Sequence, residues 1–179
     1  MEQLLLHTCC GPDLTYAFEF FSRNYRVTGY FANDNIDSAM EYDKRFEQAA
    51  VVADEYGFEI IKKKYEPHKF EEVSRGLEEE PEQGIRCAEC HRMNFRSAVE
   101  FAKIMKIDNI STTLTISPHK NVGMINRVGS EVASESGISF IGENLRKNDG
   151  FKKSLLLSKK LNLYRQSWCG CKFSRGKLG

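Results

Sequence analysis

The sequence has no long hydrophobic run, and this absence bounds where the protein can work. None of its apolar stretches approaches the roughly 20 residues that a membrane-spanning helix needs. The first residues, MEQLLLH, also lack the basic start and the cleavage site of a secretory signal peptide. We therefore expect a cytoplasmic protein with no membrane partner. In that reducing compartment, cysteines serve more often as metal ligands or redox groups than in structural disulfides.

Proline is also scarce, with four residues in a chain of 179, and the sequence has neither an internal repeat nor a low-complexity segment. The stretch poorest in apolar residues, 76–86, is acidic and is too short to link two domains, so we expect an exposed loop there. A chain of this length buries roughly two thirds of its unfolded surface and can fold around its own core. We therefore predict a single domain over residues 1–179.

A large excess of one charge is lacking too, because the net charge is +1 at pH 7. The two halves of the chain nevertheless differ. Residues 1–90 hold 10 Lys and Arg against 19 Asp and Glu, whereas residues 91–179 hold 16 against 6. This asymmetry is typical of a basic face that binds a polyanion such as nucleic acid. Solvated helix faces that happen to differ in sign would give the same counts.

What the sequence does contain is a regular alternation of short apolar runs with amphipathic stretches. The expected strands are 4–8, 26–32, 58–61, 110–115 and 139–142. The expected helices are 13–22, 37–56, 67–75, 88–105, 117–136 and 151–161. This order predicts an α/β fold with a mostly parallel, doubly wound sheet flanked by helices. Sites in such folds form at the carboxyl ends of strands, where Cys9, Cys10, Asn33 and Asn35 are expected.

The six cysteines form three close pairs: the N-terminal pair (Cys9, Cys10), the CxxC pair (Cys87, Cys90) and the C-terminal pair (Cys169, Cys171). The CxxC pair is expected at a helix N-terminus, where the helix dipole favours thiolates. Adjacent residues in an extended chain point to opposite sides. We therefore expect the N-terminal pair to point apart and to serve two neighbouring centres.

Counting thiols suggests how the cysteines are divided between centres. The CxxC pair, with one thiol from each of the other two pairs, gives the four ligands of a 4Fe-4S cluster. The two remaining thiols and Asp13 then form a second metal site, for which iron is favoured over zinc. A closed structural zinc site with four thiolates and two free cysteines is the alternative.

Several motifs along the chain together resemble one enzyme family. They are LLHTCCGPD, FANDNIDSAMEYDKR, RCAECHRMNFRSA, STTLTISPHKN and ENLRKNDGFKKSLLLSKKLNLYRQSWCGCKFS, in this order. The chain is thereby similar to the cobalamin-independent epoxyqueuosine reductases of the QueH family. The resemblance implies a Rossmann-like fold of the HUP type, an iron–sulfur cluster with an adjacent metal ion, and reduction of epoxyqueuosine in a tRNA anticodon.

One position departs from the pattern of that family, whose members often carry a third cysteine where this chain has Asp13. We expect the carboxylate to replace a thiolate as ligand of the second metal. The SGGxDS phosphate loop of ATP-using HUP relatives is absent, so no nucleotide hydrolysis is expected. Reduction of an epoxide needs two electrons and two protons. We expect an unidentified electron donor, and Asp13, His7 and Tyr164 are the candidate proton donors.

The basic half of the chain is expected to bind the tRNA that carries epoxyqueuosine. The candidate contacts are Arg146, Lys147, Lys152, Lys153, Arg165, Gln166, Lys172 and Arg175. Trp168 is a candidate for stacking on an extruded base, although a lone Trp more often packs in a core.

Two other classes of protein remain open on the sequence alone. A zinc-stabilised module that binds tRNA without catalysis would use the same cysteines as structural ligands. A thiol-disulfide oxidoreductase would use the CxxC pair without a metal.

Overall fold

Five parallel strands form one sheet in the computed structural model of the chain, which describes residues 1–175. The strands are β1 (Glu2–Thr8), β2 (Tyr25–Phe31), β3 (Ile60–Lys62), β4 (Asn109–Thr112) and β5 (Ser139–Phe140). Their order across the sheet is β3-β2-β1-β4-β5, and each neighbouring pair is parallel. The chain thus runs outward from β1 to one edge and then from β4 to the other. The predicted doubly wound α/β fold is confirmed.

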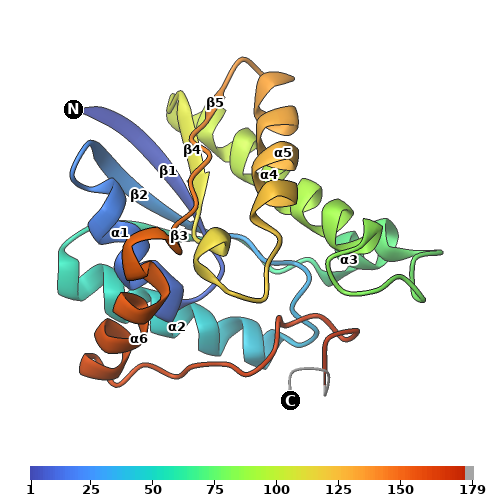
Figure 1. The fold of residues 1–179 in the computed structure, drawn as a ribbon. Helices are drawn as coiled ribbons and strands as arrows, with labels where there is room; N and C mark the ends of the chain where they lie inside the picture. Colours follow the sequence, from blue (N-terminus) through green and yellow to red (C-terminus); the bar gives the residue numbers. More distant parts are fainter. Residues whose placement is uncertain (176–179) are drawn as a thin grey trace.

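Helices cover both faces of this sheet. They are α1 (Gly11–Phe21), α2 (Ala39–Tyr56), α3 (Pro67–Ser74), α4 (Ile85–Met105), α5 (Val122–Ser134) and α6 (Gly150–Lys160), with short 3-10 turns η1 (Leu114–Ile116) and η2 (Lys147–Asp149). Helices α1, α2 and α6 lie on one face, and α4 and α5 lie on the other (Figure 1). No helix within residues 1–175 has the length and apolar character needed to cross a membrane.

The alternation of side chains along β1 explains why both faces are covered. Leu5 packs with the apolar residues of α4 and α5, whereas Leu4 and Leu6 pack with those of α1 and α2. All three leucines are fully buried. A strand buried on both faces carries a continuous apolar run, as LLL does here. This buried central strand fixes the position of the residues that follow it, Cys9 and Cys10.

Helices α1 and α4 begin earlier than the sequence predicted. Gly11 and Pro12 form the first turn of α1, because proline is tolerated where a helix leaves its first N–H groups unpaired. Helix α4 likewise begins at Ile85 and not at Ala88. As a result, Asp13 lies in the first turn of α1 and Cys87 in the first turn of α4.

The helix expected to start at Ser117-Pro118 begins instead at Val122. Its N-cap is Asn121, whose side chain accepts a hydrogen bond from the Met124 N–H at 3.0 Å. Asparagine is among the best N-cap residues, and it satisfies an N–H that would otherwise lack a partner. The strand before it, β4, is also shorter than predicted and ends at Thr112. The connection from Thr113 to Asn121 therefore lies at the carboxyl edge of the sheet.

The start of α6 provides a test of this packing. A Cβ atom at Gly150 would lie 1.8 Å from the Leu145 carbonyl oxygen and 2.6 Å from a ring carbon of Tyr16. We expect Gly150→Ala to lower the free energy of unfolding by on the order of 2 kcal/mol, because the crowded helix must move. Urea denaturation followed by circular dichroism measures this effect. Gly123→Ala is the control, because its Cβ would meet only Asn121 Oδ1 at 3.5 Å. If the free energy of unfolding falls less in Gly150→Ala than in Gly123→Ala, the close packing described around Gly150 is wrong.

Candidate metal centre and substrate cavity

A cavity of about 170 Å³ opens at the carboxyl ends of β1 and β2. One cysteine of each pair, Cys9, Cys90 and Cys169, lines it. Polar side chains from seven segments complete the wall: Asp13, Asn33, Asn35, Arg45, Glu82, His91, Asn94, His119, Lys120, Arg165 and Gln166. Segments that are far apart in the sequence thus meet at the edge of the sheet where a parallel α/β fold forms its sites.

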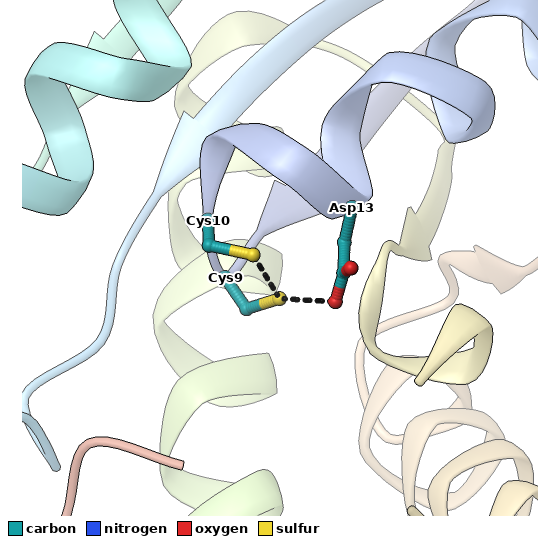
Figure 2. Close-up of side chains that lie close together, drawn as sticks. All are labelled: Cys9, Cys10 and Asp13. Carbon is teal, nitrogen blue, oxygen red and sulfur yellow. Dashed lines mark hydrogen bonds between the residues drawn. The ribbon is translucent and has the colours of Figure 1, made fainter. Parts of the chain in front are cut away.

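The N-terminal pair and Asp13 form a group with the spacing of metal ligands. The two sulfurs lie 3.7 Å apart, and Cys9 Sγ lies 3.6 Å from Asp13 Oδ2. One ligand atom from each of the three residues lies within 4.8 Å of the others. Figure 2 shows the side chains turned toward one another at the start of α1. The residues that this group contains are suited to a single metal ion with mixed sulfur and oxygen ligands.

The expectation that Cys9 and Cys10 point apart is therefore wrong. It assumed that the two residues continue the alternation of a strand, but β1 ends at Thr8 and Cys10 is the N-cap of α1. The two sulfurs lie on the same side, 3.7 Å apart. Asp13 follows one turn of helix later and completes the group.

The surroundings of this group fix its geometry and its charge. Thr113 accepts a hydrogen bond from the Cys9 N–H at 3.1 Å and donates its hydroxyl to Cys9 Sγ at 3.2 Å. Arg165 lies 3.7 Å from the Asp13 carboxylate. Burial raises the pKa of Asp13, and the nearby Arg165 charge opposes this effect. A hydrogen bond to Cys10 and burial raise the pKa of the Cys9 thiol. A bound cation would favour the deprotonated forms that serve as ligands.

The CxxC pair lies in the first two turns of α4. Cys87 is half-buried and accepts a hydrogen bond from the Gln83 N–H at 3.3 Å, whereas Cys90 is buried. The sequence predicted that the helix N-terminus would favour thiolates here. In the structure, burial raises the pKa of both thiols. A bound metal would favour their deprotonated forms.

The C-terminal pair is held at the cavity by contacts to its backbone. Arg45 of α2 donates hydrogen bonds to the carbonyls of Cys169 at 2.9 Å and Trp168 at 3.3 Å. Gly170 has a φ of +118°, a conformation that side chains rarely adopt, and its carbonyl accepts from the Asp37 N–H at 3.0 Å. These contacts bring the end of the chain back under α2, as Figure 1 shows.

The CxxC and C-terminal pairs are neighbours in space. Cys90 and Cys171 pack in one small cluster with Phe70. Cys169 lines the cavity beside Cys90, and a hydrogen bond from the Cys171 thiol holds the pKa of Cys169 well below its usual range. The same contact, with burial, raises the pKa of Cys171. Cys90 of α4 is thus close to both cysteines of the C-terminal pair.

Lys120 is a site residue that the sequence interpretation missed. Its ammonium lies 2.7 Å from Cys169 Sγ, and it lines both the cavity and a smaller hollow beside Cys87. Although burial opposes the effect, the negative charge on Cys169 raises the pKa of Lys120. The signal that would have found it is the STTLTISPHKN motif. We interpreted its Ser117-Pro118 as a helix start, whereas it is a loop at the carboxyl edge of the sheet.

Two of the candidate proton donors do not line the cavity. His7 is fully buried, with Nδ1 3.0 Å from the Thr112 hydroxyl and Nε2 3.0 Å from the Ala32 carbonyl. Burial lowers the pKa of His7 to about 4, so it is a neutral residue that joins β1 to its neighbours. The Lys44 ammonium lies 3.4 Å from the centroid of the Tyr164 ring, and the Tyr164 hydroxyl faces Glu41. Only Asp13 of the three candidates lines the cavity.

The cavity also presents amides that suit a polar substrate. Asn94 of α4 donates to Asn35 Oδ1 at 3.1 Å, and Asn33 donates to the Thr8 carbonyl at 2.8 Å. Gln166 Oε1 is buried and has no hydrogen-bond partner among the described residues. Asn94 was not predicted from the sequence, because a polar residue within an amphipathic helix is usually solvated. A ligand in the cavity would meet both donors and acceptors on this wall.

The predicted tRNA contacts divide into two sets. Arg165 and Gln166 line the cavity, and Trp168 lines it beside them. Arg146 is half-buried near the Pro118 carbonyl, and Arg175 lies 3.5 Å from Asp37 and over the Trp168 ring. The exposed lysines of this set lie outside the cavity on η2, α6 and the final loop: Lys147, Lys152, Lys153 and Lys172.

Comparisons with known proteins agree on one family. The model of the family described as Epoxyqueuosine reductase QueH matches residues 4–177. A Staphylococcus epidermidis protein with this name is 33% identical over 99% of the chain and 78% of its own length. The Thermotoga maritima protein of the same name is 32% identical over 97% of the chain and 91% of its length.

A solved structure supports the fold. The U34-tRNA thiolase NcsA from Methanococcus maripaludis, solved with its [4Fe-4S] cluster, aligns with a TM-score of 0.57. The alignment covers 97% of this chain and 61% of the thiolase, at 15% sequence identity.

Proposed function

Because this chain belongs to the epoxyqueuosine reductase QueH family, we propose that it removes the epoxide oxygen from epoxyqueuosine in a tRNA anticodon, which gives queuosine. The observation that carries the proposal is that one cysteine of each pair, together with Asp13, lines one polar cavity. A purely structural metal site would not need a cavity lined by Asn35, Asn94 and Arg165 beside its ligands.

The geometry favours a different division of the cysteines from the one that counting suggested. We propose that Cys9, Cys10 and Asp13 hold the single metal ion, because these three already face one another. The CxxC and C-terminal pairs then supply four thiolates, the complement of a 4Fe-4S cluster. The thiolase of similar fold is itself described with such a cluster.

The reaction sets the requirements that the cavity must meet. Removing the epoxide oxygen breaks two C–O bonds, forms one C=C bond, consumes two electrons and two protons, and releases water. When bound, the cluster supplies electrons and the single metal ion, favoured as iron, supplies a Lewis acid for oxygen. The electrons come from a donor that is external to the chain.

The residues of the chain bind and orient the modified base. Asn35 and Asn94 present hydrogen-bonding groups to the hydroxyls of its cyclopentane ring. Trp168 stacks on a base drawn out of the anticodon loop. Arg165 contributes a positive charge at the cavity, and the lysines of η2 and α6 contact phosphates beyond it. Glu82 also lines the cavity and would repel phosphates, so the tRNA backbone is expected to avoid it.

An assay of the purified protein tests the proposal. We expect protein prepared without oxygen to contain iron and acid-labile sulfide in amounts near those of one 4Fe-4S cluster per chain. With a reductant and tRNA that carries epoxyqueuosine, it should yield queuosine, measured by mass spectrometry of nucleosides. Failure of cluster-loaded protein to convert this tRNA would refute the reductase proposal. A colourless zinc protein would indicate a binding module, and a metal-free CxxC pair that cycles with dithiols would indicate an oxidoreductase.

A further inference from the structure

Lys120 differs from the other lysines near the sheet in the partner that it contacts. Lys62 and Lys63 pair with the carboxylates of Asp43 and Asp34. Lys120, by contrast, has no carboxylate partner within 4.0 Å among residues 1–175, and its ammonium donates to Cys169 Sγ at 2.7 Å. The structure thus places a half-buried cation directly against a sulfur.

The loop that carries Lys120 is positioned to hold it there. His119 and Lys120 lie between η1 and the Asn121 cap of α5. The carbonyl of His119 accepts a hydrogen bond from the Gln83 side chain at 3.0 Å, and Gln83 in turn donates its N–H to Cys87 Sγ. Gln83 therefore connects the lysine loop to the CxxC pair.

We propose that Lys120 is a positioning residue that donates an N–H···S hydrogen bond to Cys169 and stabilises the reduced state of the iron–sulfur centre. This inference rests on the proposed function, in which Cys169 is a ligand of the cluster. Lys120 touches neither substrate nor iron and acts through the sulfur. Its role is to set the reduction potential at which the centre accepts an electron.

The physical reason is the change of charge on reduction. A thiolate-bound cluster gains one negative charge when it accepts an electron, and a fixed cation nearby favours that state. Hydrogen bonds to the sulfurs and the local charge are among the main determinants of cluster potentials. The interaction is stronger inside a protein than in water because screening is weaker. Arg45 is also near the C-terminal pair, but it donates to the Cys169 and Trp168 carbonyls and not to a sulfur.

Redox titration of the cluster-loaded protein without tRNA tests the inference, with electron paramagnetic resonance as the readout. Lys120→Gln removes the charge but keeps an N–H donor, and Lys120→Arg keeps both. We expect the midpoint potential to shift to a more negative value in Lys120→Gln and to shift less in Lys120→Arg. Lys103→Gln, an exposed site on α4, is the control for loss of one charge and should leave the potential unchanged.

The outcomes separate this inference from the proposed function. If the wild-type protein binds no cluster, the cofactor part of the proposed function fails. If Lys120→Gln binds the cluster with an unchanged potential, only the role of Lys120 is refuted. If both Lys120 variants fold, as shown by circular dichroism, but neither binds iron, the side chain merely supports the loop and the inference is likewise refuted.

Discussion

Cys90→Ala is expected to yield a folded protein that binds no 4Fe-4S cluster and does not convert epoxyqueuosine. Cys90 is buried on α4, lines the cavity and packs with Cys171 of the C-terminal pair. Its thiolate is one of the four proposed ligands, and alanine offers no replacement. We expect acid-labile sulfide to fall to the background level and iron to fall to the amount held by the single metal site. The conversion rate should fall by on the order of 100-fold or more, since even indirect support of a metal ligand is worth 10–100-fold.

A second substitution on the same helix controls for damage to α4. Ser97→Ala removes a hydroxyl that lies 3.0 Å from the Tyr30 hydroxyl, away from the cavity, and should leave iron content and conversion near the wild-type level. Circular dichroism of Cys90→Ala shows whether the helix is retained. A Cys90→Ala protein with four irons and a normal cluster spectrum would contradict the proposed ligand set.

Asp13→Asn is expected to remove the single metal ion while the cluster remains. The carboxylate lies 3.6 Å from Cys9 Sγ in the three-residue group, and asparagine has the same size but no charge. A neutral amide is a weaker ligand for a divalent ion than a carboxylate. We expect the metal content to fall by about one equivalent and conversion to fall by on the order of 100-fold. Metal analysis, together with the cluster spectrum, distinguishes this loss from that in Cys90→Ala.

Two further variants sharpen the assignment of Asp13. Asp13→Cys should retain the ion, because a thiolate replaces one charged ligand by another. Asp43→Asn is the control, since Asp43 is an exposed partner of Lys62 on the far side of α2. If Asp13→Asn keeps its full metal content and activity, Asp13 is not a ligand. Loss of the cluster in Asp13→Asn would show that both metal centres depend on the Asp13 carboxylate.

The fold was largely predictable because its signals are local. The LLL run identified β1 as a strand buried on both faces, and Gly57, with a φ of +70°, ends α2 where the sequence predicted. The errors came from competition between caps. Ser117-Pro118 is a plausible helix start, but the Asn121 side chain bonds the Met124 N–H and the helix begins there. A strong N-cap residue can determine the helix start even when a weaker N-cap signal lies a few residues earlier. The sequence pattern alone does not show which of the two N-caps is stronger.

The sequence predicted which residues form the site better than it predicted how their side chains are arranged. The cysteines were found because they are few and paired, and Asp13 because it lies close to the N-terminal pair in the sequence. The direction of the Cys9 and Cys10 side chains could not be predicted, because both residues lie between the end of β1 and the start of α1 and do not follow strand alternation. His7 illustrates a second limit, because its role depends on Thr112 and Ala32, two contacts from distant strands. Lys120 illustrates a third, since one lysine in a basic region carries no distinguishing pattern.

The attachment of the C-terminal loop to Arg45 sets the order in which this protein can mature. Half of the proposed cluster ligands, Cys169 and Cys171, follow the sheet and helices α1 to α6 in the sequence. Domains generally fold from the N-terminus as they are synthesised. The proposed four-thiolate site is therefore complete only after the loop that carries Cys169 has reached Arg45 of α2. A nascent chain halted before Cys169 would lack half of the proposed cluster ligands.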